Sequence, residues 1–189
     1  HRGDYFSLVD YALVGVEVPL DININDEKIK FVGFIDLVFK HKKTAQILVK
    51  DIKCTYGGWS AEKKKDPIKK NQLLLYKKFY ADNYKAKIED IEVEFFIVRR
   101  KIWQSDWGEI KRVQLFKPAQ SIYTVNDVMK DFNKFITSCF DLETGQYKDD
   151  VSLYTPTPSP TSCEYCSFKN NKELCKVGLD LPKKVYVKK

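Results

Sequence analysis

Asp36, Asp51 and Lys53 combine two carboxylates and an ammonium group in one short stretch of the sequence. Each acid ends a largely apolar run, FVGFID or ILVKD. Asp51 and Lys53 are two residues apart, so in a strand their side chains project from the same face. Two carboxylates can share a divalent cation, while a nearby lysine orients a water molecule or stabilises negative charge. These residue types therefore favour metal-dependent hydrolysis of a phosphodiester bond.

The two acids can meet if the strands that carry them form a hairpin. The polar loop 41–44 between them is short enough for one, although it lacks an Asn-Gly pair. If the loop is centred between Lys43 and Thr44, Asp36 lies directly opposite Asp51, with Cβ atoms about 4.5 to 5.5 Å apart. Facing carboxylates repel each other unless a cation separates them, and oxygen ligands favour Mg²⁺ or Mn²⁺. A shift of one residue in the turn would remove this pairing.

Both acids could instead cap strand ends or pair with nearby lysines. For two unrelated acids in a sequence with 33 Lys and Arg residues, that structural role would be the better interpretation. The Asp-x-Lys spacing and the hairpin register together favour the metal site.

The rest of the pattern predicts an α/β fold with a mixed sheet. Asp66 followed by Pro67 predicts a helix over 67–80, because Asp caps the first turn and Pro fits its first position. Strands are expected where apolar residues alternate or run together: 12–20, 29–40, 45–53, 91–102 and 110–117. Apolar residues at helical spacing predict a second helix after Asn126: Val128, Met129, Phe132, Phe135, Ile136, Cys139 and Phe140.

Three motifs occur in order: Gly33-Phe34-Ile35-Asp36, Asp51-Ile52-Lys53 and Gln72-Leu73-Leu74-Leu75-Tyr76. Together they resemble the RecB-like branch of the PD-(D/E)xK nucleases, which includes CRISPR-adaptation nucleases and many phage-encoded exonucleases. The resemblance covers about residues 12 to 175. It implies a restriction-endonuclease-like core, with a central mixed β-sheet flanked by helices, and a C-terminal extension that contains cysteines.

The resemblance also implies roles for individual residues. Asp36, Asp51 and the backbone carbonyl of Ile52 would bind Mg²⁺ or Mn²⁺, and Lys53 would be catalytic. The expected activity is hydrolysis of DNA, as an exonuclease in replication, recombination or repair in a phage or a microbe. An endonuclease with the same residues, or an inactive nucleic-acid-binding module of the same fold, are the alternatives.

Gln72 and Tyr76 would line the active site of such a nuclease. They are four residues apart and share a helix face with Ile68 and Phe79. The alternative for Tyr76 is a place in the core, and this alternative is weaker for Gln72 because its side chain is polar.

Relatives in this family carry a further metal ligand upstream, either His or Glu. Glu17 projects from the first strand opposite a valine face (Val14, Val16 and Val18) and is one candidate. His1, at a family-like distance before the acids, is the other. Because the sequence begins with His1 rather than Met, an N-terminal part is expected to be missing. The choice between the two stays open.

A lysine-rich segment follows the strand that carries Lys53. With a net charge of +7 and a pI near 9.0, the chain suits a polyanionic partner such as DNA, in single strands or at duplex ends. A solvated loop is the alternative. Three tryptophans, Trp59, Trp103 and Trp107, could stack on unpaired bases, although packing within the fold is the better interpretation. The lysines expected to contact phosphates are Lys63, Lys64, Lys65, Lys69 and Lys70.

Three cysteines follow a Pro-rich segment near the end of the sequence: Cys163, Cys166 and Cys175. They resemble the C-terminal cysteines that, in part of this family, join a distant N-terminal cysteine around a [4Fe–4S] cluster. A cluster or structural Zn²⁺ normally needs four ligands. Cys54 and Cys139 are not obvious substitutes, so either the missing N-terminal part supplies the fourth or this tail holds no metal.

The length of 189 residues and a hydrophobic content of 43% favour one domain. It should comprise a nuclease core over 1–154 and a connector with its Cys-containing tail over 155–189, packed on the core. No apolar run approaches the roughly 18 to 20 residues that cross a membrane. Five cysteines without a signal peptide favour the cytoplasm of a microbial or phage-infected cell.

Overall fold

The computed structural model describes residues 9–25, 28–102, 111–150, 157–164, 166–169 and 171–176. The chain divides into two units, His1–Tyr147 and Lys148–Lys189, and each is described by itself. In the second unit, the described residues include one short helix, α4 (Pro160–Glu164). All the elements that position the candidate site belong to the first unit.

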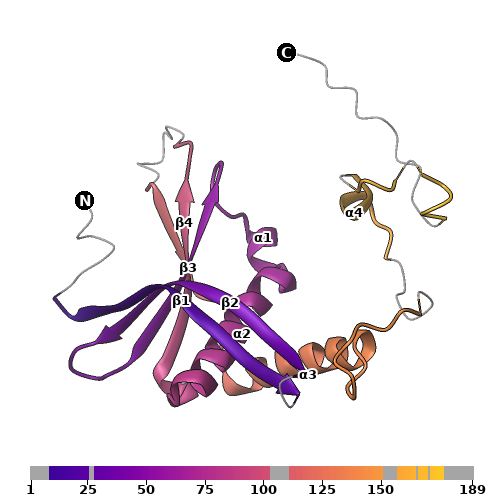
Figure 1. The fold of residues 1–189 in the computed structure, drawn as a ribbon. Helices are drawn as coiled ribbons and strands as arrows, with labels where there is room; N and C mark the ends of the chain where they lie inside the picture. The colour runs from indigo at the N-terminus through magenta and orange to yellow at the C-terminus, as the bar shows by residue number, and fades with distance from the viewer. Residues whose placement is uncertain are drawn as a thin grey trace. The chain divides into compact units, whose positions relative to one another are not determined.

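A five-stranded sheet in the order β1-β2-β3-β4-β5 organises the first unit (Figure 1). β3 and β4 run parallel, whereas the other neighbouring strands are antiparallel. The prediction of a mixed sheet is therefore confirmed. The strands are β1 (Tyr11–Asn25), β2 (Ile29–His41), β3 (Ile47–Thr55), β4 (Ile91–Arg99) and β5 (Val113–Phe116).

Two long helices pack with the sheet around one apolar core. The helix expected at Pro67 is α2 (Pro67–Tyr84), and a carboxylate oxygen of Asp66 accepts a hydrogen bond of 3.0 Å from the Ile68 N–H, as the cap prediction required. This helix extends beyond residue 80 and ends where Lys85 adopts a left-handed conformation. A short helix α1 (Ala61–Lys65) precedes it, and a 3₁₀ turn, η2 (Ile88–Asp90), follows it.

The second long helix, α3 (Ile122–Cys139), begins earlier than the sequence pattern indicated. Ser121 is its cap, because the Ser121 hydroxyl accepts a hydrogen bond of 3.3 Å from the Thr124 N–H. Val125, which the predicted helix left out, is buried, whereas Phe135 is 54% exposed. The expected start after Asn126 was therefore wrong by about one turn.

The β2–β3 hairpin has the register that the sequence predicted. Four residue pairs follow it, from Leu37 with Lys50 to Lys40 with Ile47. The Nδ1 atom of His41 closes the turn by accepting hydrogen bonds from two backbone N–H groups, at 3.3 and 3.1 Å. The imidazole of His41 therefore has a structural role in the turn.

β2 and β3 separate at the position of the two acids. Before Leu37, β2 pairs with β1 alone, and beyond Lys50, β3 pairs with β4 alone. Figure 1 shows the β1–β2 and β3–β4 ribbons running in different directions from this point. We call the point of separation, at Asp36 and Asp51, the fork.

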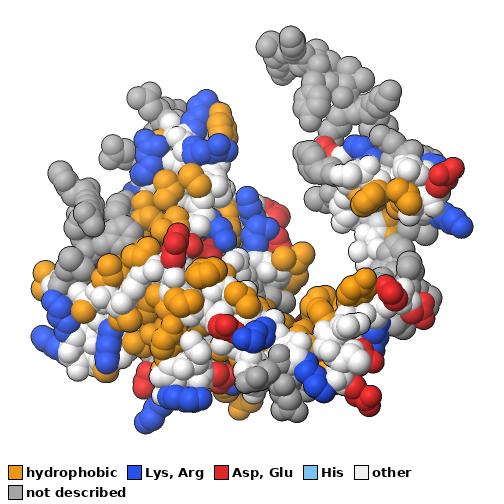
Figure 2. Space-filling view, in the orientation of Figure 1, with side chains coloured by type: hydrophobic (Ala, Val, Ile, Leu, Met, Phe, Trp, Pro, Cys, Tyr) orange, Lys and Arg blue, Asp and Glu red, His pale blue; other side chains and the backbone are white. Residues whose placement is uncertain are grey.

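β1 does not present the single valine face that its sequence predicted. Val18 is buried, but Val14 and Val16 are 51% and 60% exposed. The register shifts after Leu13, and Glu17 has a positive φ of 49°, so the alternation of side chains is interrupted. Figure 2 shows hydrophobic side chains on the surface over this part of the sheet.

The turn that leaves β3 depends on Gly58. Its φ is 96°, and its N–H donates a hydrogen bond of 2.9 Å to the Thr55 hydroxyl. A Cβ atom at this position would lie 2.6 Å from Nε of Arg99 and 3.0 Å from Oε1 of Gln114. The backbone conformation therefore requires glycine, and a Cβ atom would in addition displace these two side chains.

Gly58→Ala should lower the free energy of unfolding by about 1 to 3 kcal/mol, because alanine is strained at this φ and collides with Arg99. Gly33→Ala is the matched control, since a Cβ there would have its nearest neighbours at an ordinary 3.5 Å. Its effect should stay within about 0.5 kcal/mol. Denaturant unfolding of both variants measures the difference, and equal losses would contradict this account of the turn.

Candidate active site

Asp51 is a buried carboxylate with one cationic partner. Its side chain is 4% exposed, and the Lys53 side chain, which is 31% exposed, places its ammonium 2.8 Å from the Asp51 Oδ2 atom. The Oδ2 atom itself is buried, so this ion pair is shielded from water on the carboxylate side. β3 projects both side chains from the same face, as the Asp-x-Lys spacing predicted.

The surroundings of Asp51 raise its pKa above the ordinary value for an aspartate. Burial is the largest cause, the nearby Lys53 ammonium opposes it, and the carboxylate of Asp36 adds to it. The two acids are therefore close enough to repel each other. A divalent cation at this position would neutralise both charges, and carboxylate oxygens are the ligands that such a cation prefers, so these residues fit a metal ion.

Asp36 is held at the fork by the backbone of the neighbouring strand. Its Oδ2 atom accepts a hydrogen bond of 2.6 Å from the Ile52 N–H. The last pair of the β2–β3 ladder is Leu37 with Lys50, so this side-chain bond replaces the next backbone pairing. The carboxylate of Asp36 is consequently directed toward β3, the strand of Asp51.

The structure does not complete the metal site with a third side chain. Glu17 lies between Val16 and Val18, which pair with the residues on either side of Asp36, but its side chain is exposed. Within the described ranges, no three His, Cys, Asp or Glu side chains converge on one point. His1 lies outside the described residues, so the choice between Glu17 and His1 stays open.

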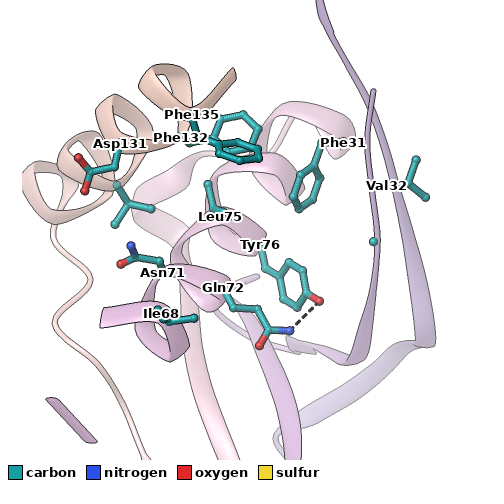
Figure 3. A pocket seen from close by; sticks show the side chains of 12 residues that line it. Phe31, Val32, Ile68, Asn71, Gln72, Leu75, Tyr76, Asp131, Phe132 and Phe135 are labelled. Atoms are coloured by element: carbon teal, nitrogen blue, oxygen red, sulfur yellow. Dashed lines mark hydrogen bonds between the residues drawn. The ribbon is translucent and has the colours of Figure 1, made fainter. Parts of the chain in front are cut away.

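Gln72 and Tyr76 form a pair on α2. The Gln72 side-chain amide donates a hydrogen bond of 3.0 Å to the Tyr76 hydroxyl. Both side chains line a cavity of about 740 Å³ between β2, α2 and α3, and Gly33 of β2 lines it as well (Figure 3). The three charged residues at the fork do not line this cavity. The expected role of Gln72 and Tyr76 in the active site therefore stays a prediction.

Three of the five lysines expected to contact phosphates have local partners. The Lys63 ammonium lies 5.9 Å from the centre of the Trp59 ring, and the Lys64 ammonium lies 5.7 Å from that of Phe116. Lys69 forms an ion pair with the cap residue Asp66. Among the described residues, Lys65 and Lys70 form no salt bridge. Contact of all five with a nucleic acid stays a prediction.

Trp59 is part of the core. It is buried, and its ring lies 4.7 Å from the Phe95 ring, centre to centre. Its backbone N–H donates a hydrogen bond of 2.8 Å to the Gln114 side chain, so packing is confirmed as its role. Trp103 and Trp107 lie outside the described residues.

The cysteine tail does not form a metal centre among the described residues of its unit. Cys163 is buried, while Cys166 and Cys175 are half-buried, and all three are free thiols. They do not come together as a group that could hold a metal ion within the part of the chain that the structure describes. The [4Fe–4S] or Zn²⁺ site is therefore unsupported by the structure.

Sequence reasoning missed two parts of this region. The Ile52 N–H fixes Asp36, and no side-chain pattern could reveal that contact because it depends on where the ladder ends. Asn71 and Asp131 line the cavity, and each lies next to a residue that the sequence did place, Gln72 or Phe132. The sequence did not reveal that α2 and α3, which are distant in the sequence, come together at this cavity.

The model of the PD-(D/E)XK nuclease superfamily matches residues 3–171. The chain therefore belongs to this superfamily, whose members are nucleases that typically use divalent metal ions such as Mg²⁺. A search of curated proteins found no match to the chain. In the described part of the chain, no helix is long and apolar enough to cross a membrane.

Asp51→Asn should raise the free energy of unfolding of the metal-free protein at about pH 7. Because the pKa of Asp51 is raised by burial, ionisation of this carboxyl destabilises the fold as the pH rises above its unfolded value of 3.8. Asparagine carries no charge, so its advantage should shrink as the pH is lowered toward 3.8. Denaturant unfolding in the presence of a chelator, across this pH range, measures the effect.

Asp127→Asn is the matched control for this prediction, since Asp127 is exposed on α3. It should give no comparable gain at neutral pH. An equal gain in both variants would show that the burial of Asp51 is not the cause.

Proposed function

We propose that the chain is a Mg²⁺- or Mn²⁺-dependent deoxyribonuclease, and that it acts as an exonuclease in replication, recombination or repair. The observation that carries this proposal is the buried Asp51 carboxylate beside Asp36 and Lys53 at the fork, in a chain of the PD-(D/E)XK superfamily. The net charge of +7 supports a polyanionic substrate.

Asp36, Asp51 and the backbone carbonyl of Ile52 would hold the metal ion. When bound, the ion would polarise a phosphoryl oxygen and lower the pKa of a bound water. The Lys53 ammonium lies 2.8 Å from Oδ2 of Asp51, one of these proposed ligands. Lys53 would thus orient the attacking water or stabilise the negative charge that develops on the phosphate. The hydrogen bond from the Ile52 N–H to Asp36 Oδ2 would hold the second acid in place.

The setting we propose is the cytoplasm of a microbial cell or of a phage-infected host cell. None of the five cysteines forms a disulfide, which suits a reducing compartment.

Lys53→Ala should lower the rate of DNA cleavage by roughly 100-fold or more, because it removes the only cation paired with Asp51 among the described residues. DNA binding should stay nearly unchanged, since the site keeps both acids. Lys43→Ala, in the exposed turn of the same hairpin, is the control and should cleave like the wild type. Cleavage assays with Mg²⁺ or Mn²⁺, alongside binding assays, measure both properties.

Retained cleavage in Lys53→Ala would overturn this mechanism. Metal-independent DNA binding by the wild type with no hydrolysis would instead support an inactive binding module of the same fold.

The exonuclease proposal predicts that end-labelled linear DNA is degraded while closed circular DNA of the same sequence stays intact. An enzyme that requires an end cannot start on a circle. Gel analysis of both substrates in one reaction measures the difference. Cleavage of the circle would show that the chain is an endonuclease with the same active-site residues.

A further inference from the structure

The cavity between β2, α2 and α3 is lined by aromatic rings from all three elements. Phe31 of β2 lies 6.0 Å from Phe132 of α3, centre to centre, in an edge-to-face arrangement. Phe135, one turn further along α3, also lines the cavity and is 54% exposed, so its ring remains accessible. Figure 3 shows these three rings on one side, with Gln72 and Tyr76 on the other. Such walls suit a flat, apolar ligand.

The cavity wall also carries polar groups that can recognise the edge of such a ligand. The side-chain amides of Asn71 and Gln72 and the carboxylate of Asp131 belong to the lining. Among the described residues that line the cavity, Asp131 is the only charged one, and its negative charge would repel a phosphate. A ligand with an aromatic body, hydrogen-bonding edges and no negative charge of its own therefore fits best.

The cavity adjoins the fork through β2 and α2. Gly33 lines it and precedes Asp36 by three residues, which corresponds to about 10 Å along an extended strand. A Cβ atom on Gly33 would lie 3.5 Å from the Tyr76 ring, so α2 packs closely against β2 there. A nucleic-acid strand with a phosphate at the two acids would have its neighbouring nucleotides within reach of the cavity.

We propose that this cavity binds an unpaired base of the strand that is cleaved, and that the substrate is therefore single-stranded DNA or a frayed duplex end. This inference rests on the proposed nuclease function. Stacking on Phe132 and Phe135 holds the base, and the amides of Asn71 and Gln72 contact its edge. Repulsion by Asp131 keeps the sugar-phosphate backbone outside, on the side of the fork. An aromatic side chain from a partner protein is the competing ligand.

The test compares two single-stranded oligonucleotides, one complete and one with abasic nucleotides at successive positions, with the metal chelated to prevent cleavage. Fluorescence anisotropy with the full chain measures the affinity for each. The wild type should bind the complete strand roughly 5- to 100-fold more tightly than the strand with the critical abasic position, as the loss of one stacked base requires. Phe135→Ala should bind the complete strand more weakly and no longer distinguish the two.

Tyr123→Ala is the matched control variant. Tyr123 is also an aromatic residue on α3 and is 79% exposed, but it does not line the cavity. This variant should behave like the wild type with both oligonucleotides. Because the abasic strand tests the wild-type protein directly, the comparison does not depend on the folding of any variant.

Equal affinity of the wild type for complete and abasic strands at every position would overturn the base-binding cavity. A loss of affinity in Phe135→Ala that is equally large for both strands would also overturn it. Metal-dependent cleavage by the same wild-type protein would then leave the nuclease function standing. An abasic effect without metal-dependent cleavage would refute the nuclease function and keep the base-binding cavity. No binding of either strand would overturn the base-binding cavity, and the absence of metal-dependent cleavage as well would overturn both.

Discussion

The hydrogen bond from the Ile52 N–H to the Asp36 carboxylate is the contact on which the candidate site depends. It forms where the β2–β3 ladder ends, and it joins the two strands at the point where they separate. Without it, Asp36 would lie at the start of a diverging strand with nothing to direct its side chain toward Asp51. This single hydrogen bond thus directs the Asp36 carboxylate toward Asp51 at the point where the hairpin ladder ends.

Two neighbouring buried residues of β3, Lys50 and Asp51, differ in how well their charges are compensated. Lys50 forms a buried ion pair of 3.0 Å with Glu94 of the neighbouring strand, so both buried charges are compensated. The next residue, Asp51, is equally buried, yet it has a partly exposed lysine and a repelling acid beside it. A fold selected only for stability would not keep this carboxylate. The presence of this buried, poorly compensated carboxylate is consistent with a requirement for function.

The sequence predicted the hairpin register because a short polar loop between two apolar strands leaves few alternatives. It also predicted the start of α2, since Asp66 and Pro67 determine the first turn locally. Prediction from the sequence failed where tertiary contacts determine the local structure. Glu17 has a positive φ that no pattern signalled, and α3 begins at a Ser121 cap that lacks the usual acidic partner. The exposure of Phe135 depends on how α3 packs against α2, and the spacing of apolar residues gives no information about that packing.

The residues proposed to act in hydrolysis come from the two parts of the sheet that separate at the fork. The β3–β4 side supplies Asp51 and Lys53, while the β1–β2 side supplies Asp36 together with Gly33 and the Phe31 wall of the cavity. α2 connects them, because its buried residues pack in the same core as both strands. In the proposed mechanism, metal binding would therefore require contributions from both sides, whereas the proposed base-binding cavity involves only the β1–β2 side. A change in the angle between the two sides would then alter catalysis more than affinity for a single strand.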